Sequence, residues 1–148
     1  MKKAIQILSF FLAGGLYAQK IDYNTKKGFV AHGYDVVAYF SNTATPGKAK
    51  YIATHKGAKF KFSNKKNLEL FNNNPDKYTP QYGGYCAYAI ASKAKVKINP
   101  ETFLIKNDKL YLFYKKWGVN TLKKWKKEQP EKLEQLANKN WKTMKYKK

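Results

Sequence analysis

The chain of 148 residues has one cysteine, no arginine and only nine acidic residues. With Cys86 as the sole cysteine, no disulfide can form within the chain. Without arginine, the chain also lacks the planar, bidentate side chain with which specific readers of nucleic acid bind bases and phosphates. These absences exclude a disulfide-stapled fold and argue against a sequence-specific nucleic-acid partner.

The chain has many positively charged residues and few negatively charged ones. All 30 basic residues are lysines, and the formal net charge is +21. A field of this strength attracts polyanions such as nucleic acid, anionic lipid or acidic glycan. We interpret the lysines mainly as a solvated basic surface, with a dedicated polyanion site as the alternative. A weak attraction to anionic membrane surfaces is the partner interaction that charge alone predicts.

Residues 1–18 have the layout of a secretory signal peptide. Lys2 and Lys3 give a positive start, an apolar stretch follows, and Ala18 supplies a small residue before the expected cleavage. The stretch is too short for a stable membrane span, and no later stretch is long or apolar enough for one; an uncleaved N-terminal anchor is the alternative. We therefore expect export to the periplasm or the extracellular medium. Loss of the two lysines leaves a mature charge of +19.

The remainder has the size of one ordinary domain. We divide it into a polar N-terminal segment (19–28), a domain (29–127) and a lysine-rich C-terminal helix (128–148). From Lys115 onward the apolar residues follow helical spacing, and Pro130 suits the first turn of a helix. This last helix can pack on its own domain, which we favour, or rest on a membrane. Its apolar stripe consists of Leu133, Leu136, Ala137, Trp141 and Met144.

The centre of the chain predicts hairpins and short helices. Alternating segments on either side of Lys56-Gly57, and again of Asn107-Asp108, are typical of β-hairpins. Ser63 or Asn64 can cap a short helix, and a second helix is expected over about 85–92. The predicted fold class is α+β: a small antiparallel sheet or hairpins with short helices, followed by C-terminal amphipathic helices.

Cys86 follows the pair Gly83-Gly84 and stands in the first turn of the second expected helix. Unpaired backbone N–H groups at a helix start favour a thiolate, and glycines let a ligand or another strand approach the backbone closely. This placement predicts a partly accessible, reactive thiol. The alternative is that Cys86 only fills space in the core, as free cysteines often do.

Other chemistry-bearing residues are sparse. His32 and His55 lie beside predicted strand ends, and a thiolate with an imidazole would suit copper, zinc or another soft or borderline metal ion. No CxxC or HxxxH spacing supports such a site, and Asp35 is expected to cap a turn. The sequence shows no Ser/His/Asp set, phosphate loop or paired carboxylate, so its residues supply no argument for an enzyme.

Three segments carry a resemblance to a known family: "GYDVVAYF", "FSNKKNLELFNNNPDKYTPQYGGYCAYA" and "KLYLFY". Together they are similar to the YHS-domain family, specifically its exported single-cysteine branch, from about Gly33 to Trp125. The resemblance implies a small α+β fold, with 29–127 as the YHS-like domain, and a metal- or redox-linked role. Cysteine-rich members carry further metal-binding cysteines where this chain has Ala38 and Phe62-Ser63, so those ligands are missing.

Cys86 and His55 match the exported branch, and the resemblance makes them the candidate metal ligands. Some members have selenocysteine at the position of Cys86, which implies chemistry at the chalcogen. The surrounding motif residues are Asp35, Tyr82, Gly83, Gly84 and Tyr85.

The resulting prediction is an exported YHS-domain protein that uses Cys86 as a soft-metal ligand or a redox-responsive thiol, with His55 as its helper. The expected ligand is copper or another soft metal ion, and the expected partner is that ion or a redox partner. Two alternatives stay open. One is an electrostatic binding module for an anionic envelope surface, and the other is a purely structural domain.

Overall fold

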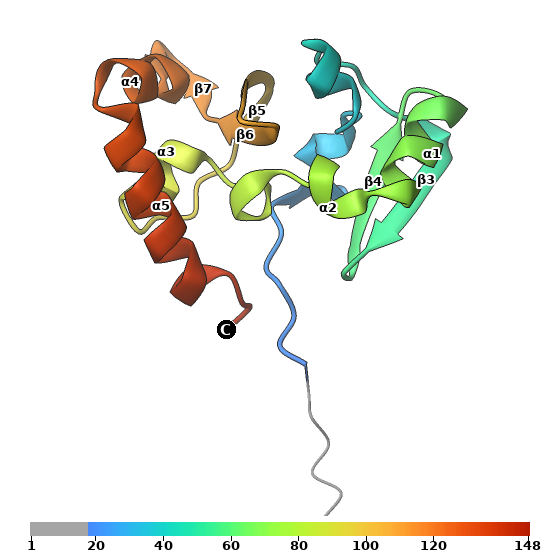
Figure 1. Cartoon of the computed structure of the whole chain (residues 1–148), viewed down its shortest axis with the longest axis horizontal. Helices are drawn as coiled ribbons and strands as arrows, with labels where there is room; N and C mark the ends of the chain where they lie inside the picture. Colours follow the sequence, from blue (N-terminus) through green and yellow to red (C-terminus); the bar gives the residue numbers. More distant parts are fainter. Residues whose placement is uncertain (1–17) are drawn as a thin grey trace, which may run out of the picture.

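The structure is a computed structural model that describes residues 18–148 (Figure 1). Of the predicted signal peptide it includes only Ala18, and the rest lies outside the described residues. Within the described part, no helix combines the length and the apolar character that a membrane span requires. Short strands and short helices precede two C-terminal helices, which confirms the predicted α+β class.

A four-stranded sheet forms one side of the molecule (Figure 1). The predicted hairpin at Lys56-Gly57 is confirmed and joins the two longest strands of this sheet. One strand pair, however, runs parallel through Phe29 and Lys59, so the sheet is mixed and not wholly antiparallel as predicted. The strands are β1 (Thr25–Lys26), β2 (Phe29–Val30), β3 (Lys48–His55) and β4 (Ala58–Phe62), in the order β1-β2-β4-β3.

Short helical segments connect and cover this sheet. After β2 the chain passes through the 3₁₀ turns η1 (Ala31–Gly33) and η2 (Ala38–Ser41), which carry it to the start of β3. Helix α1 (Lys65–Asn73) packs on β3 and β4 and is followed by α2 (Pro75–Tyr78). The side chain of Asn64 accepts the N–H of Asn67 at 2.8 Å, so Asn64 is the N-cap, one of the two residues predicted.

The other side of the molecule contains the remaining elements (Figure 1). The predicted hairpin at Asn107-Asp108 is confirmed, with Phe103 opposite Leu112 and Ile105 opposite Leu110. A further hairpin, which the sequence did not predict, precedes the two C-terminal helices. The elements are η3 (Gln81–Gly84), α3 (Ala87–Ala91), β5 (Asn99–Lys106), β6 (Lys109–Phe113), β7 (Lys115–Lys116), β8 (Val119–Asn120), α4 (Thr121–Lys127) and α5 (Pro130–Met144).

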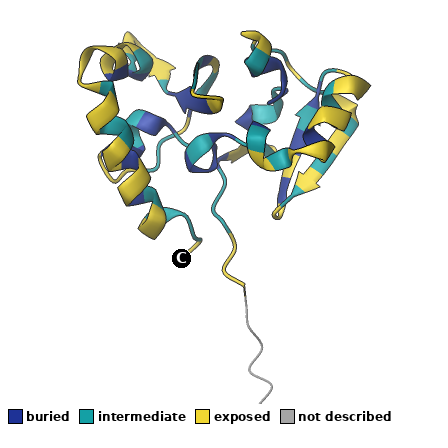
Figure 2. Cartoon of the chain, viewed as in Figure 1, coloured by how far each residue is buried: buried dark blue, intermediate teal, exposed yellow. Residues whose placement is uncertain are grey.

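Strand β6 joins two hydrophobic clusters because it is buried on both faces. Leu110 and Leu112 enter a cluster with the sheet and α1, whereas Tyr111 and Phe113 enter a second cluster with α3, α4 and α5. The alternation follows from the two-residue period of a strand. In Figure 2 the buried residues lie on the central elements, and exposed residues cover the outer faces of α5 and β3. The two sides therefore share one strand as their common core.

Helix α5 packs on the domain, as the apolar stripe predicts. Ala137 is fully buried, and Leu133, Trp141 and Met144 contact the second cluster, while Leu136 remains exposed. Pro130 stands in the first turn, also as predicted. The side-chain amide of Asn140 donates to the carbonyl oxygens of Ile90 and Ala91, which ties the middle of α5 to the end of α3.

The polar N-terminal segment (19–28) is held by the rest of the chain. The N–H of Asp22 donates to the carbonyl of Lys145, and the N–H of Lys147 donates to the carbonyl of Lys20. The side-chain amide of Asn24 is buried and donates to the carbonyl of Gly84 at 3.0 Å. The first and last described segments therefore lie side by side and stabilise each other.

Candidate functional site

Cys86 lies in the core and has no exposed surface. It is the N-cap residue of α3, which begins at Ala87, two residues after the expected start near Tyr85. Its Sγ atom lies 3.2 Å from the hydroxyl of Thr121, which also donates to the carbonyl of Tyr114 and accepts the N–H of Tyr114. The predicted accessible thiol is therefore wrong: the side chain points inward, into the first hydrophobic cluster, and the alternative of a packing residue describes its environment.

His55 lies at the end of β3 and faces an acidic partner. Its Nε2 atom is 2.8 Å from a carboxylate oxygen of Asp76, and the same oxygen accepts the ammonium of Lys56 at 2.8 Å. The ring meets Phe71 edge-on. None of these contacts involves Cys86, whose polar neighbour is Thr121. The two predicted metal ligands thus belong to separate environments, and nowhere in residues 18–148 do three His, Cys, Asp or Glu side chains gather as a metal site requires.

Asp35 is a fully buried carboxylate that five donors satisfy. One oxygen accepts the backbone N–H groups of Val37 and Ala38, at 2.9 and 3.2 Å, which confirms the predicted turn cap. The other accepts the N–H and the hydroxyl of Ser63, at 2.8 and 2.7 Å, and the side-chain amide of Asn67 at 2.7 Å. Asp35 therefore also joins the start of η2 to the end of β4 and to α1.

The glycine pair before Cys86 lets another part of the chain approach closely. A Cβ atom on Gly83 would lie 2.7 Å from the carbonyl oxygen of Asp22 and 3.0 Å from the ring of Trp141. The N–H of Asn24 donates to the carbonyl of Gly83 at 2.9 Å. The space that the sequence assigned either to a ligand or to another strand is thus occupied by the N-terminal segment and α5.

The two tyrosines of the same motif hold these neighbours. The hydroxyl of Tyr82 donates to the side-chain carbonyl of Asn138 at 2.8 Å. The hydroxyl of Tyr85 donates to Asp22 at 3.2 Å, and burial together with that carboxylate raises the pKa of Tyr85 to about 12. The ammonium of Lys95 reaches the same carboxylate oxygen at 2.7 Å. Tyr82 and Tyr85 therefore act as neutral hydrogen-bond donors that connect this motif to α5 and to the N-terminal segment.

Most of the lysines face solvent without an acidic partner. Two of the 30 lysines, Lys2 and Lys3, lie outside the described residues, which leaves 28. Only five of these form a salt bridge; the other 23 have no carboxylate oxygen within 4.0 Å in the part of the chain that the structure describes. The five paired lysines are Lys56, Lys65, Lys77, Lys95 and Lys106.

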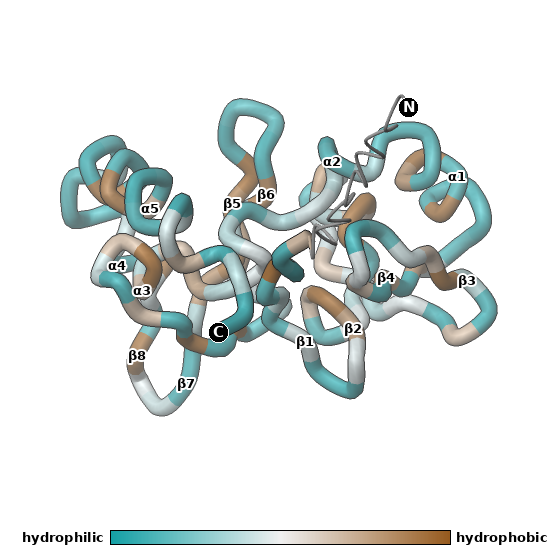
Figure 3. The backbone as a smooth tube through the Cα atoms, turned by 90° about the horizontal axis from the view of Figure 1, so that it is seen from below, coloured by the Kyte–Doolittle hydropathy of each residue, from teal (hydrophilic) through white to brown (hydrophobic). Residues whose placement is uncertain are grey.

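The unpredicted hairpin β7–β8 carries the most exposed large apolar side chain of the described chain. Trp117 is 85% exposed, and Val119, two residues further along the chain, is 41% exposed. The hairpin projects from the body of the molecule (Figure 3). Its turn was missed because the helical spacing that begins at Leu122 was extended back to Lys115. The signal that could have revealed it is Gly118, which follows Trp117 between two short extended segments.

Two hollows adjoin this hairpin. One of about 510 Å³ is lined by Lys26, Lys97, Lys115 and Lys116, together with His32 and Trp117. The other, of about 410 Å³, shares Lys115, Lys116 and Trp117 and adds Lys123. None of the described residues that line either hollow is acidic. We call Lys115, Lys116, Trp117, Val119 and Lys123 the hairpin face.

The charge state of His32 is set by its surroundings. Burial lowers the pKa of the imidazole below its ordinary value, and the positive charges of Lys26 and Lys97 lower it further. The ring is therefore neutral at pH 7 and adds no charge to the lysines of the first hollow. The hairpin face can bind negative groups through its lysines and apolar material through Trp117.

Comparison with known proteins yields no relative: no family model, no curated protein and no solved structure matches this chain.

Proposed function

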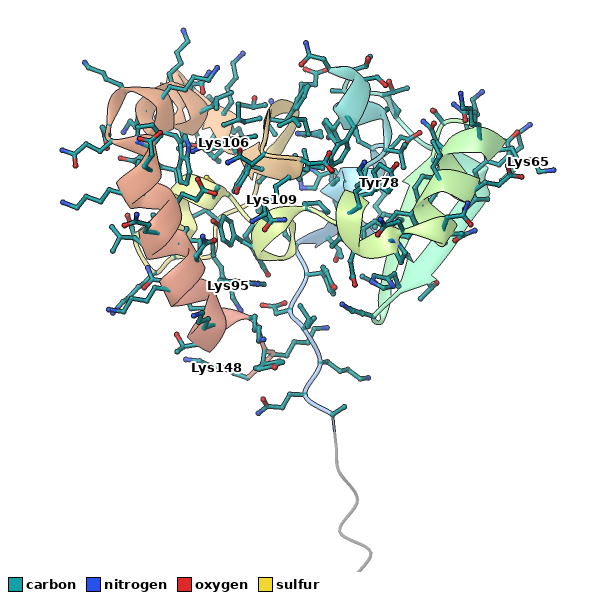
Figure 4. The ribbon with its side chains drawn as sticks, viewed as in Figure 1. Lys65, Tyr78, Lys95, Lys106, Lys109 and Lys148 are labelled. Carbon is teal, nitrogen blue, oxygen red and sulfur yellow. The ribbon has the colours of Figure 1, made fainter. Side chains whose placement is uncertain are left out.

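We propose that the protein is exported and binds anionic lipid surfaces of the cell envelope by electrostatic attraction, with the hairpin face as its contact. The observation that carries this proposal is the surplus of 23 lysines without a carboxylate partner in the described chain. In Figure 4 two labelled lysines without a salt bridge, Lys109 at the start of β6 and Lys148 at the end of the chain, lie apart, so the unpaired positive charge is not confined to one element.

Seven of the nine acidic residues already have partners within the chain. Asp35 is buried among five donors, and six other carboxylates are engaged by lysines or by His55. They therefore compensate the charge of their own partners and not that of the unpaired lysines. The six are Asp22, Glu69, Asp76, Asp108, Glu131 and Glu134.

Two features favour a lipid surface over nucleic acid as the anionic partner. The chain has no arginine, the residue that supplies bidentate phosphate and base contacts in nucleic-acid complexes. In addition, the exposed Trp117 lies among Lys115, Lys116 and Lys123, and an indole beside lysines is typical of the membrane–water interface.

The expected strength follows from the number of lysines that contact the surface. A lysine near an anionic membrane contributes about 1 kcal/mol at moderate salt. The three lysines of the hairpin face would then contribute roughly 3 kcal/mol, or about a hundredfold in affinity. The attraction falls off within a Debye length, which is about 10 Å at 0.1 M salt and about 3 Å at 1 M.

Sedimentation with lipid vesicles tests the proposal. The protein to use is the chain from Gln19, the mature form that the predicted cleavage would leave. We expect binding to phosphatidylglycerol-containing vesicles at about 0.05 M salt, much weaker binding near 1 M salt, and little binding to pure phosphatidylcholine vesicles. The absence of binding to the anionic vesicles at low salt, or equal binding to both kinds of vesicle, would contradict the proposal.

The soft-metal or redox role of Cys86 remains a prediction from the sequence, and we do not extend the proposal to it. The thiol has no exposed surface, and its sulfur contacts a hydroxyl oxygen, which is a poor ligand for soft metal ions. Membership of the YHS-domain family and export likewise remain predictions from the motifs.

A further inference from the structure

Residues 18–148 contain four β-hairpins that provide an internal comparison. Each has a two-residue turn in which both residues have positive φ, the geometry that twisted hairpins require. In three turns the first residue is polar, and in the fourth it is tryptophan. The four turns are Lys27-Gly28, Lys56-Gly57, Asn107-Asp108 and Trp117-Gly118.

Neither turn chemistry nor packing explains Trp117. Its φ of 48° is uncommon for a residue with a bulky side chain, and asparagine or aspartate suits this position better. The indole is 85% exposed, so it contributes little to either hydrophobic cluster. Its close neighbour is the ammonium of Lys116, which lies 3.9 Å from the ring centroid. The fold thus gains little from a tryptophan here, which points to a partner outside the fold.

The surroundings of Trp117 indicate the chemistry of that partner. Val119, two residues further on in β8, adds a second exposed apolar side chain. Lys115 and Lys116 line both neighbouring hollows, Lys123 lines the smaller one, and Lys26 and Lys97 line the larger one. An apolar tip with lysines nearby complements a layer in which hydrocarbon lies beneath negatively charged groups.

We propose that the tip of the β7–β8 hairpin inserts Trp117 into the headgroup region of an anionic phospholipid bilayer. This inference rests on the proposed function and adds to it the element that enters the membrane. Lys115, Lys116 and Lys123 bind lipid phosphates around the inserted indole, because lysine stems can lie along apolar surface while their ammonium groups reach the phosphates. The indole has an apolar body and a polar N–H, the combination that favours the interface.

Insertion and attraction differ in their response to salt. Ion pairs with phosphates weaken as salt is added, whereas burial of the indole does not depend on screening. Binding should therefore have a component that persists at salt concentrations where lysine contacts are largely screened. We attribute this salt-resistant component of the binding to the inserted hairpin tip.

The test compares three variants of the chain from Gln19 on phosphatidylglycerol-containing vesicles. Trp117→Asn removes the indole and creates an Asn-Gly turn, which favours this hairpin, so the fold should be retained. Trp117→Tyr keeps an interfacial aromatic ring. Asn107→Trp, added to Trp117→Asn, restores an exposed tryptophan at a different hairpin tip, where Asp108 follows it.

We expect Trp117→Asn to weaken vesicle binding about tenfold and to remove its salt-resistant component, with the melting temperature unchanged or raised. Trp117→Tyr should retain most of the binding, and the added Asn107→Trp should not restore it. Tryptophan fluorescence of the unaltered chain should shift to the blue on anionic vesicles and be quenched by brominated lipid. Trp117→Asn should show neither change, because Trp125 is buried and Trp141 packs on the domain.

Different results would overturn the two proposals separately. If the unaltered chain binds anionic vesicles but Trp117→Asn binds equally well and has the same fluorescence response, the insertion proposal is wrong and the electrostatic function stands. Restoration of binding by Asn107→Trp would also overturn it, since any exposed tryptophan would then suffice. If the unaltered chain binds heparin or DNA but no anionic vesicle, both proposals are wrong.

Discussion

The sulfur of Cys86 lies 3.2 Å from the hydroxyl of Thr121, and the two side chains close the space between the start of α3 and the start of α4. Thr121 is itself only 8% exposed and exchanges two hydrogen bonds with the backbone of Tyr114. The thiol therefore sits behind a side chain that the adjoining strand end holds in place. Its chemistry depends on whether the fold opens.

This burial predicts an unreactive thiol. Iodoacetamide should modify Cys86 in the folded protein only at the rate at which the fold opens, and at the rate of a free thiol in about 6 M guanidinium chloride. Cys86→Ser should cost no more than about 2 kcal/mol, since the serine hydroxyl can bond to Thr121. Mass spectrometry of timed samples gives the rate. Rapid alkylation without denaturant would contradict the buried position and would support the hypothesis that Cys86 is a functional thiol.

Asp35→Asn should destabilise the protein by about 2–4 kcal/mol. The amide can present an N–H₂ group to one set of donors, so either Val37 and Ala38 or Ser63 and Asn67 would lose an acceptor. The control is Asp108→Asn, at a side chain that is 66% exposed, which should change stability by less than about 0.5 kcal/mol. Urea unfolding measures both. Equal midpoints for the two variants would show that the carboxylate of Asp35 is not required.

Gly83→Ala should cost more than Gly57→Ala, although both glycines have positive φ. At Gly57 no atom lies within 4 Å of an added Cβ, so that variant measures backbone strain alone, about 1–2 kcal/mol. At Gly83 the added atom also meets the carbonyl of Asp22 and the ring of Trp141. Thermal unfolding of the pair isolates the cost of the close approach. If the two variants lose the same stability, the N-terminal segment does not depend on that glycine.

Glu134 should make stability depend on pH. Burial would raise the pKa of its carboxyl, but hydrogen bonds from Tyr111 and Lys106 outweigh burial and hold the pKa below its ordinary value of 4.5. A group whose pKa is lower in the folded state stabilises the fold above the unfolded pKa, and that contribution is lost as the pH falls through the folded pKa.

The measurement is the free energy of unfolding of the unaltered chain minus that of Glu134→Gln, followed against pH. The difference should be constant between about pH 6 and 7 and should shrink below about pH 4.5. Subtraction removes the titration of the other carboxylates, provided they are unaffected by the substitution. A difference that stays constant down to about pH 3 would show that Glu134 is not stabilised by its charge.

Features set by local chemistry could be predicted from the sequence. The turns Lys56-Gly57 and Asn107-Asp108 lie between alternating segments, and the N-cap at Asn64 and the first-turn Pro130 follow from the preferences of single residues. The stripe on α5 predicted its packing because a 3.6-residue period places those side chains on one face.

Features that depend on contacts between distant residues could not be predicted from the sequence. The period of a short helix does not tell which neighbour covers its first residue, so the accessibility of Cys86 was misjudged. The partner of Gly83 lies about sixty positions earlier in the chain, in the segment around Asn24, and no local pattern identifies it. The hairpin face was not predicted because tryptophan is unusual as the first residue of a turn. The exposure of Trp117 also depends on how the rest of the chain folds.

The most direct measurement of the central claim is affinity for phosphatidylglycerol-containing vesicles at about 0.1 M salt for two matched lysine variants. One carries Lys115→Gln, Lys116→Gln and Lys123→Gln in the hairpin face; the other carries Lys48→Gln, Lys50→Gln and Lys59→Gln on β3 and β4. All six lysines are exposed, none forms a salt bridge, and each set removes three charges.

The hairpin-face variant should bind at least about tenfold more weakly than the unaltered chain, because each lysine at the contact contributes about 1 kcal/mol. The β3–β4 variant should bind nearly as well as the unaltered chain, since charges more than a Debye length from the bilayer are screened. Equal losses in the two variants, or no loss in either, would contradict the claim that the hairpin face binds the anionic surface.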